Sequence, residues 1–203
     1  MSIYTLDQAI KPSRASISTS TGRSKGGKAR TGDIELPDYI APEPKNAAER
    51  RDWERMSSAM EGFHSYFRHS FRQLFELSDG SFEKRGMTVR DFMRLSDDFT
   101  KHLEFHHGIE EQHIFPILAK RMPQFRDDHQ EEHDTIHEGM DSLKSLTKRL
   151  KVEPNLYSPD EFRKNLASWG PILFYHLDAE VASLKPDVLR RYWTLAEVKQ
   201  LPM

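Results

Sequence analysis

The sequence predicts an all-α protein, an up-down bundle of four long helices, and two observations support this fold class. Apolar residues recur at intervals of three and four along four long segments, as they do on a helix with one buried face. No segment shows the strict apolar–polar alternation that a half-buried strand requires. Because short connections join the four segments, we expect each helix to run antiparallel to the next.

The first two helices are predicted over residues 46–77 and 88–121. The first ends at the turn signal Ser78-Asp79-Gly80, and its inner stripe comprises Trp53, Met56, Met60, Phe63, Phe67, Phe71 and Leu74. The second carries the stripe Leu95, Phe99, Leu103, Ile114 and Ile117. Pro116 lies inside this second segment, where it marks a kink or a new start, because proline cannot donate a helical hydrogen bond.

The last two long helices are predicted over residues 127–150 and 160–184, with a proline-bounded loop between them. The inner stripe of the third comprises Ile136, Met140, Leu143 and Leu150. That of the fourth comprises Phe162, Leu166, Trp169, Leu173, Leu177 and Val181. A short C-terminal helix is expected over residues 187–195.

Residues 1–45 are predicted to be a disordered, flexible basic tail and linker, and residues 46–203 form the bundle with its C-terminal extension. The tail is rich in Ser, Thr, Gly, Lys and Arg, whereas the whole chain has a net charge of −2, so we do not expect a nucleic-acid partner. No apolar run could span a membrane, and there is no cysteine. We expect a cytoplasmic protein; a mitochondrial presequence is the alternative for the Ser- and Arg-rich tail.

Histidines with a four-residue spacing occur on three of the predicted helices. His106 and Glu110 form HxxxE on the second, and His176 and Glu180 repeat it on the fourth. The third carries HxxxH, either as His129 with His133 or as His133 with His137, and His64 lies on the first. Because this spacing puts two side chains on one helix face, the four helices can direct five imidazoles and two carboxylates to one level of the core.

A mixed set of imidazoles and carboxylates suits iron, manganese or zinc, and the lack of thiolates disfavours copper(I). Seven ligands exceed the need of one ion and suit two, with a coordination position left open. The carboxylates can bridge the two ions and offset part of their charge of about +4 in a low-dielectric core. The pattern therefore predicts a dinuclear metal site that accepts dioxygen or a small anion.

The motifs resemble those of the hemerythrin-like, or HHE cation-binding, domain, over about residues 48–185. The strongest piece is His106-His107-Gly108-Ile109-Glu110-Glu111 followed by Ile114-Phe115-Pro116. The resemblance implies two non-haem iron ions, bridged by carboxylates and by an oxo or hydroxo group. The metal ligands that it implies are His64, His106, Glu110, His133, His137, His176 and Glu180, with His129 as the alternative third-helix ligand. The pair His133 and His137 follows the pattern of fungal members, whereas His129 and His133 follow that of oxygen carriers.

The remaining histidines are expected to have no ligand role: His69, His102 and His107 are interpreted as surface, packing or supporting residues. The pairs Glu61-x-x-His64 and Glu110-x-x-His113 also match the ExxH motif of ferritin-like di-iron carboxylate proteins. We keep that family as an alternative, although its motif belongs on the second and fourth helices.

The resemblance implies a protein that binds dioxygen or senses oxygen, iron or redox state, more than an enzyme. A di-iron peroxidase or oxidase is the alternative function. No catalytic residue and no organic cofactor site is predicted, and the sequence does not identify a protein partner for the basic tail.

Overall fold

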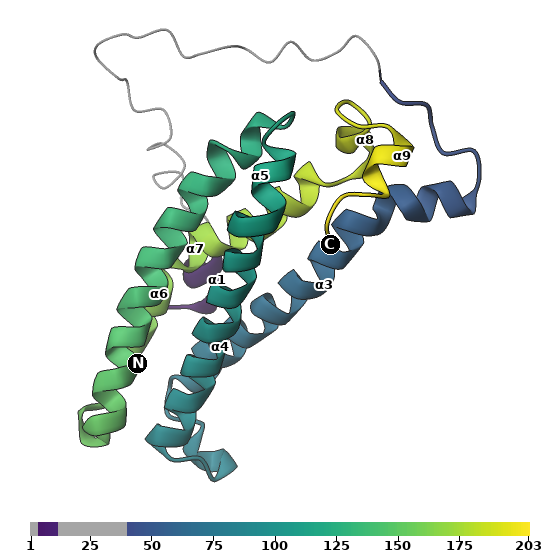
Figure 1. Cartoon of the computed structure of the whole chain (residues 1–203). Coiled ribbons are helices and arrows are strands. Elements are labelled where there is room, and N and C mark those ends of the chain that lie inside the picture. Colours follow the sequence, from purple (N-terminus) through teal and green to yellow (C-terminus); the bar gives the residue numbers. More distant parts are fainter. Residues whose placement is uncertain (1–3, 12–39) are drawn as a thin grey trace, which may run out of the picture.

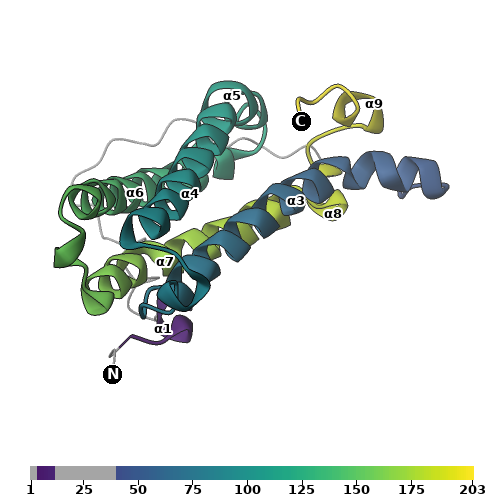
Figure 2. The same ribbon diagram turned by 90° about the horizontal axis from the view of Figure 1, so that it is seen from below.

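The computed structural model describes residues 4–11 and 40–203, and within these ranges every regular element is helical. Four long helices, α3 (Ala47–Leu77), α4 (Val89–Ile109), α6 (Asp128–Val152) and α7 (Pro159–Ser183), form the body of the molecule. In Figures 1 and 2, α3 lies beside α7 and α4 lies beside α6, and α6 also packs on α7. The predicted all-α bundle is confirmed.

Side-chain caps explain where three of the long helices begin. The Asn46 side chain accepts hydrogen bonds from the first turn of α3, and Thr88 forms a capping box with Asp91 at the start of α4. Ser158 caps α7, and Pro159 follows at the first helical position, where its missing N–H has no helical partner to lose.

No helix in the described part of the chain is long and apolar enough to cross a membrane.

The second predicted helix changes its winding beside the HxxxE motif. After α4, a π-helical turn covers Glu110–Ile114, and α5 (Phe115–Leu118) follows with Pro116 in its first turn. The Phe115 N–H donates to the Glu110 carbonyl, five residues back, as a π-turn requires. Pro116 therefore marks a new start, as one of the two expectations had it, while the π-turn itself was not predicted.

Parts of the predicted tail have defined contacts in the structure. Residues Leu6–Ile10 form α1, which packs against α7 and buries Ala9 completely. Gly170 permits this approach, because a Cβ atom there would lie 2.1 Å from the Ala9 carbonyl oxygen. Farther along, the Ala41 N–H donates to the Arg190 carbonyl. Residues 12–39 lie outside the described part, so their expected flexibility stays a prediction.

The C-terminal segment differs from the single short helix that we expected. It forms two, α8 (Pro186–Leu189) and α9 (Leu195–Val198), because Thr194 starts a separate capping box with Glu197. Both lie against the N-terminal half of α3 (Figure 1). Three 3₁₀ turns complete the described elements: Glu83–Arg85, Pro123–Phe125 and Pro154–Leu156.

The apolar interior consists of two clusters. One cluster includes Phe71, Phe99 and Trp169. The other includes Trp53 and Phe115, together with Leu189 of α8 and Val198 of α9. Phe63 was expected on the inner stripe, but its side chain is 56% exposed. The buried His64 faces the core. Because successive residues of a helix are rotated by about 100°, the neighbouring Phe63 faces away from that position.

Candidate metal centre

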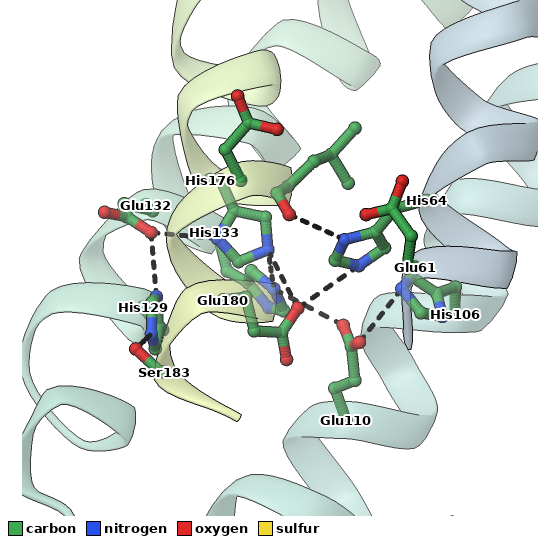
Figure 3. A network of polar contacts seen from close by, with 12 residues as sticks. Glu61, His64, His106, Glu110, His129, Glu132, His133, His176, Glu180 and Ser183 are labelled. Atoms are coloured by element: carbon green, nitrogen blue, oxygen red, sulfur yellow. Dashed lines mark hydrogen bonds and ion pairs between the residues drawn. The ribbon is translucent and has the colours of Figure 1, made fainter. Parts of the chain in front are cut away.

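A polar layer separates the two apolar clusters at one level of all four long helices. On α3, for example, buried His64 lies between Met60 of one cluster and Phe67 of the other. The same alternation places His106, Glu110, His133, His176 and Glu180 between neighbours from the two clusters. Each of these residues is at most 9% exposed. The helices thus bring together, at mid-core, polar side chains from four directions (Figure 3).

Within the described residues, four overlapping groups of side chains have the proximity that a metal ion needs, and two of these groups share Glu110. In the first, ligand atoms of His64, His106, Glu110 and Glu180 all lie within 4.8 Å of one another. In the second, Glu110 is joined by His107, His133 and His176 at the same spacing. The union of these two groups is called the inner centre below.

The two carboxylates of the inner centre lie between imidazoles of the two groups. Glu110 has one oxygen 2.9 Å from His106 Nε2 and the other 3.5 Å from His133 Nε2. Glu180 Oε2 lies 3.3 Å from His64 Nε2 and 3.7 Å from His176 Nε2 (Figure 3). This is the position of a carboxylate that could bridge two ions.

Three imidazoles are oriented by an acceptor at Nδ1, which leaves Nε2 directed to the inner centre. His64 Nδ1 is 2.8 Å from the Leu177 carbonyl oxygen, His133 Nδ1 is 2.8 Å from Glu111 Oε1, and His176 Nδ1 is 2.9 Å from Glu132 Oε2. An N–H donated at Nδ1 fixes the tautomer with a free lone pair at Nε2. Carboxylates and carbonyls in this role are typical partners of metal-binding histidines.

Eight buried nitrogen and oxygen atoms of the inner centre have no hydrogen-bond partner. They are Nε2 of His64 and His106, both ring nitrogens of His107, and both carboxylate oxygens of Glu110 and Glu180. A buried polar atom without a partner costs about 1–3 kcal/mol. Eight of them at one place, with imidazole and carboxylate chemistry, fit a cation that accepts their lone pairs.

Burial shifts the pKa values of several side chains of the inner centre. Burial lowers the pKa of His106 to about 3, and it lowers those of His107 and His133 well below the usual range. Burial and the nearby Glu180 raise the pKa of Glu110 well above its usual range. Burial also opposes ionisation of Glu180, but the nearby His64 and His176 lower its pKa. The lowered pKa values keep the imidazoles of His106, His107 and His133 neutral at pH 7, the form that coordinates metal.

The third-helix alternatives separate in the structure, although their ligand roles stay predictions. His133 lies in the inner centre, whereas His137 is 34% exposed and lies 3.0 Å from Glu111 Oε1. His129 has both ring nitrogens engaged, with Glu132 at 3.0 Å and Ser183 at 3.1 Å (Figure 3). It thus positions Glu132, which in turn holds His176.

Three residues near the inner centre were not among the predicted ligands: His107, Glu111 and Glu132. For His107 we expected a surface, packing or supporting role; it is fully buried within 4.8 Å of three members of the inner centre, and whether it binds metal stays a prediction. The signal was present in the doublets of His106-His107-Gly108-Ile109-Glu110-Glu111, which repeat the HxxxE spacing one residue later. Glu132 lies three residues after His129 on α6 and so lacked the four-residue spacing, and its other partner, His176, lies on α7.

The ferritin-like alternative does not fit the structure. His113 is exposed, and Glu61 is half-exposed and paired with Arg68 at 3.1 Å, so neither ExxH pair brings both members inside. His69 and His102 are exposed, as expected. A hydrogen bond of 2.8 Å joins His102 Nδ1 to the Tyr66 hydroxyl.

Comparison with known proteins gives two matches. The model of the hemerythrin HHE cation binding domain matches residues 55–188. The dimeric xanthone biosynthesis cluster protein R11 of Cryptosporiopsis sp. (strain 8999) is 29% identical over 103 residues, which are 47% of this chain and 38% of that protein. The match thus spans less than half the length of this curated relative. No solved structure matches the chain.

Proposed function

Because the chain belongs to the hemerythrin HHE cation-binding domain family, we propose that its inner centre holds two non-haem iron ions and binds dioxygen reversibly, as a carrier or sensor. The observation that carries this proposal is the set of eight unpartnered buried atoms at one level of the bundle. Their imidazole and carboxylate chemistry suits iron, and their number exceeds the need of one ion.

The arrangement supports a division of the ligands between two positions. His64 and His106 would serve one position, and His133 and His176 the other, with Glu110 and Glu180 shared between them. For the fifth imidazole, the sequence pointed to His137. The geometry favours His107, because it is buried, has two unpartnered nitrogens, and belongs to the same group as His133 and His176.

When bound, two ferrous ions would supply the electrons that dioxygen accepts on binding. The chain's own residues favour release of that oxygen over its conversion. Apolar side chains close the inner centre to water: Phe67, Leu103, Met140 and Leu173 are at most 3% exposed. Phe67 packs its ring 5.0 Å from that of His106.

Proton supply also distinguishes binding from turnover, since release of a peroxide needs protons. Two phenols, Tyr66 and Tyr175, are neighbours of the site in the sequence, but they are 46% and 45% exposed. Tyr66 is engaged with His102 on the outer surface of α3 and α4, at 2.8 Å. Of the carboxyls that contact the inner centre, Glu110 and Glu180 are used as ligands in the proposal, and Glu111 and Glu132 are engaged at Nδ1 of His133 and His176.

The test mixes anaerobic, iron-reduced protein with oxygenated buffer in a stopped-flow spectrometer, followed by removal of oxygen under argon. Reversible oxygen uptake of one molecule per chain, with little peroxide consumption in steady state, supports the proposal. The alternative is a di-iron oxidase or peroxidase, which the biosynthetic-cluster name of the Cryptosporiopsis relative favours. Irreversible oxidation with rapid peroxide turnover would establish that alternative instead.

A further inference from the structure

A second cluster lies beside the inner centre and reaches the surface. It consists of His107, Glu111, His133 and His137, whose ligand atoms lie within 4.8 Å of one another, and is called the outer group below. Glu111 Oε1 is 2.8 Å from His133 Nδ1 and 3.0 Å from His137 Nε2. The side chains of His137 and Glu111 are 34% and 29% exposed, whereas no member of the inner centre exceeds 10%. The outer group therefore offers ligands where a hydrated ion could arrive.

His107 is the residue that connects the two clusters. Its ring stacks on that of His133 at 3.8 Å and 8°, and it meets the ring of His137 edge-on at 5.4 Å. Hydrogen bonds to Glu111 account for His133 and His137, but both nitrogens of His107 lack a partner although the residue is fully buried. A neutral imidazole that belongs to both groups can turn one lone pair toward either of them.

We propose that His107, Glu111 and His137 form an outer cation site, through which a divalent transition metal enters the inner centre. The inference rests on the proposed function, because it requires an inner centre that takes up metal. Two imidazoles and one carboxylate suit Fe²⁺, Mn²⁺ or Zn²⁺. Stripping all water from a dication in one step would be costly in an apolar core. At the outer site the ion exchanges part of its water for protein ligands first.

The shared residues then carry the ion inward without a gap in coordination. His107 and His133 belong to the outer group and also to the inner group that contains Glu110 and His176. An ion held by His107 can therefore gain Glu110 before it loses Glu111. On the opposite side of the inner centre, Phe67 and Phe63 pack their rings 5.0 Å and 5.6 Å from His106, whose side chain is 10% exposed against 34% for His137.

The test follows cobalt(II) binding to the metal-free full chain by its visible spectrum. Wild-type protein should bind two Co²⁺ tightly and a third more weakly at Glu111 and His137, since the filled inner centre uses the lone pair of His107. The inner centre should fill within the mixing experiment. His137→Ala should still hold two tight ions, lose the weak third, and fill at least tenfold more slowly. Glu111→Gln, which retains an oxygen for His133 Nδ1, should show the same slow filling. His69→Ala, an exposed histidine outside all the groups, is the matched control and should behave as wild type.

Three outcomes overturn the inference. A wild-type filling rate in both His137→Ala and Glu111→Gln excludes an entry role. A fall from two tight ions to one in His137→Ala makes His137 an inner ligand, as the sequence predicted, and removes the outer site. If wild-type protein itself holds no pair of tight ions, the proposed function fails as well, which the first two outcomes do not imply.

Discussion

Replacing His107 by leucine should have opposite effects on the metal-free and the iron-loaded protein. In the metal-free fold, the substitution removes two unpartnered buried nitrogens, each of which costs about 1–3 kcal/mol. The lost stacking on His133 offsets about 0.5–1.5 kcal/mol of that gain. The free energy of unfolding should therefore rise by about 0.5 kcal/mol or more, which corresponds to roughly 1–2 °C or more in Tm.

The iron-loaded protein should respond in the other direction. Loss of one ligand should weaken iron binding by at least about 100-fold, more than the loss of a supporting residue does. Binding to the folded state at 100 times Kd contributes about 2.7 kcal/mol of stability, so the variant forfeits most of the stabilisation by iron. His107→Leu should thus unfold above wild type without metal and below it with iron.

Calorimetry of both variants, with and without iron, tests this reversal of order. His69→Leu is the control: its free energies of unfolding, with and without iron, should stay within about 0.5 kcal/mol of wild type, because the side chain is exposed. If His107→Leu lowers the metal-free Tm and leaves iron binding intact, His107 is a packing residue, as its sequence position first suggested. The reasoning from unpartnered atoms would then be refuted.

Two further predictions concern acid and packing. The metal-free protein should lose stability as the pH falls from about 6.5 toward 3, because the imidazoles of His106, His107 and His133 stay neutral in the fold but take up protons when unfolded. Glu110 has a raised pKa in the fold, so above a pH of about 4.5 its protonation favours the folded state on acidification, but three histidines outweigh this one group. A melting temperature of the metal-free protein that rises as the pH falls would contradict the prediction. Gly139→Ala should destabilise the fold by about 1–3 kcal/mol, because its Cβ would lie 2.3 Å from the Trp169 ring. Chemical denaturation measures this loss, and Gly62→Ala, whose Cβ would meet nothing within 4 Å, is the control.

Helix periodicity predicted most of the fold because burial of one face determines both the pattern and the packing. The observed bounds of α3, Ala47–Leu77, differ from the prediction by one residue, since Asn46 and the Ser78-Asp79-Gly80 turn act through local chemistry. The π-turn at Glu110–Ile114 could not be predicted in this way. It changes the winding of the helix between the buried Glu110 and Pro116, and periodicity in the sequence does not register such a change.

The candidate site divides in the same manner. Four-residue spacing identified His106 with Glu110 and His176 with Glu180, because both members of each pair lie on one helix face. It could not rank His129, His133 and His137, since adjacent stripes of one helix differ only by rotation. The rotation of α6 is set by contacts such as that of Gly139 with Trp169 of α7. A pattern of single pairs also did not indicate that His107, one residue beyond His106, is buried as well.

The iron content of the protein tests the central claim most directly. Wild-type chain, reconstituted anaerobically with Fe²⁺ and desalted, should contain close to two iron atoms per chain by elemental analysis. His64→Ala and His176→Ala, which alter opposite positions of the inner centre, should each lower that ratio to about one or less. A wild-type ratio near one or zero, or a ratio of two that survives both substitutions, would contradict a dinuclear centre built from these side chains.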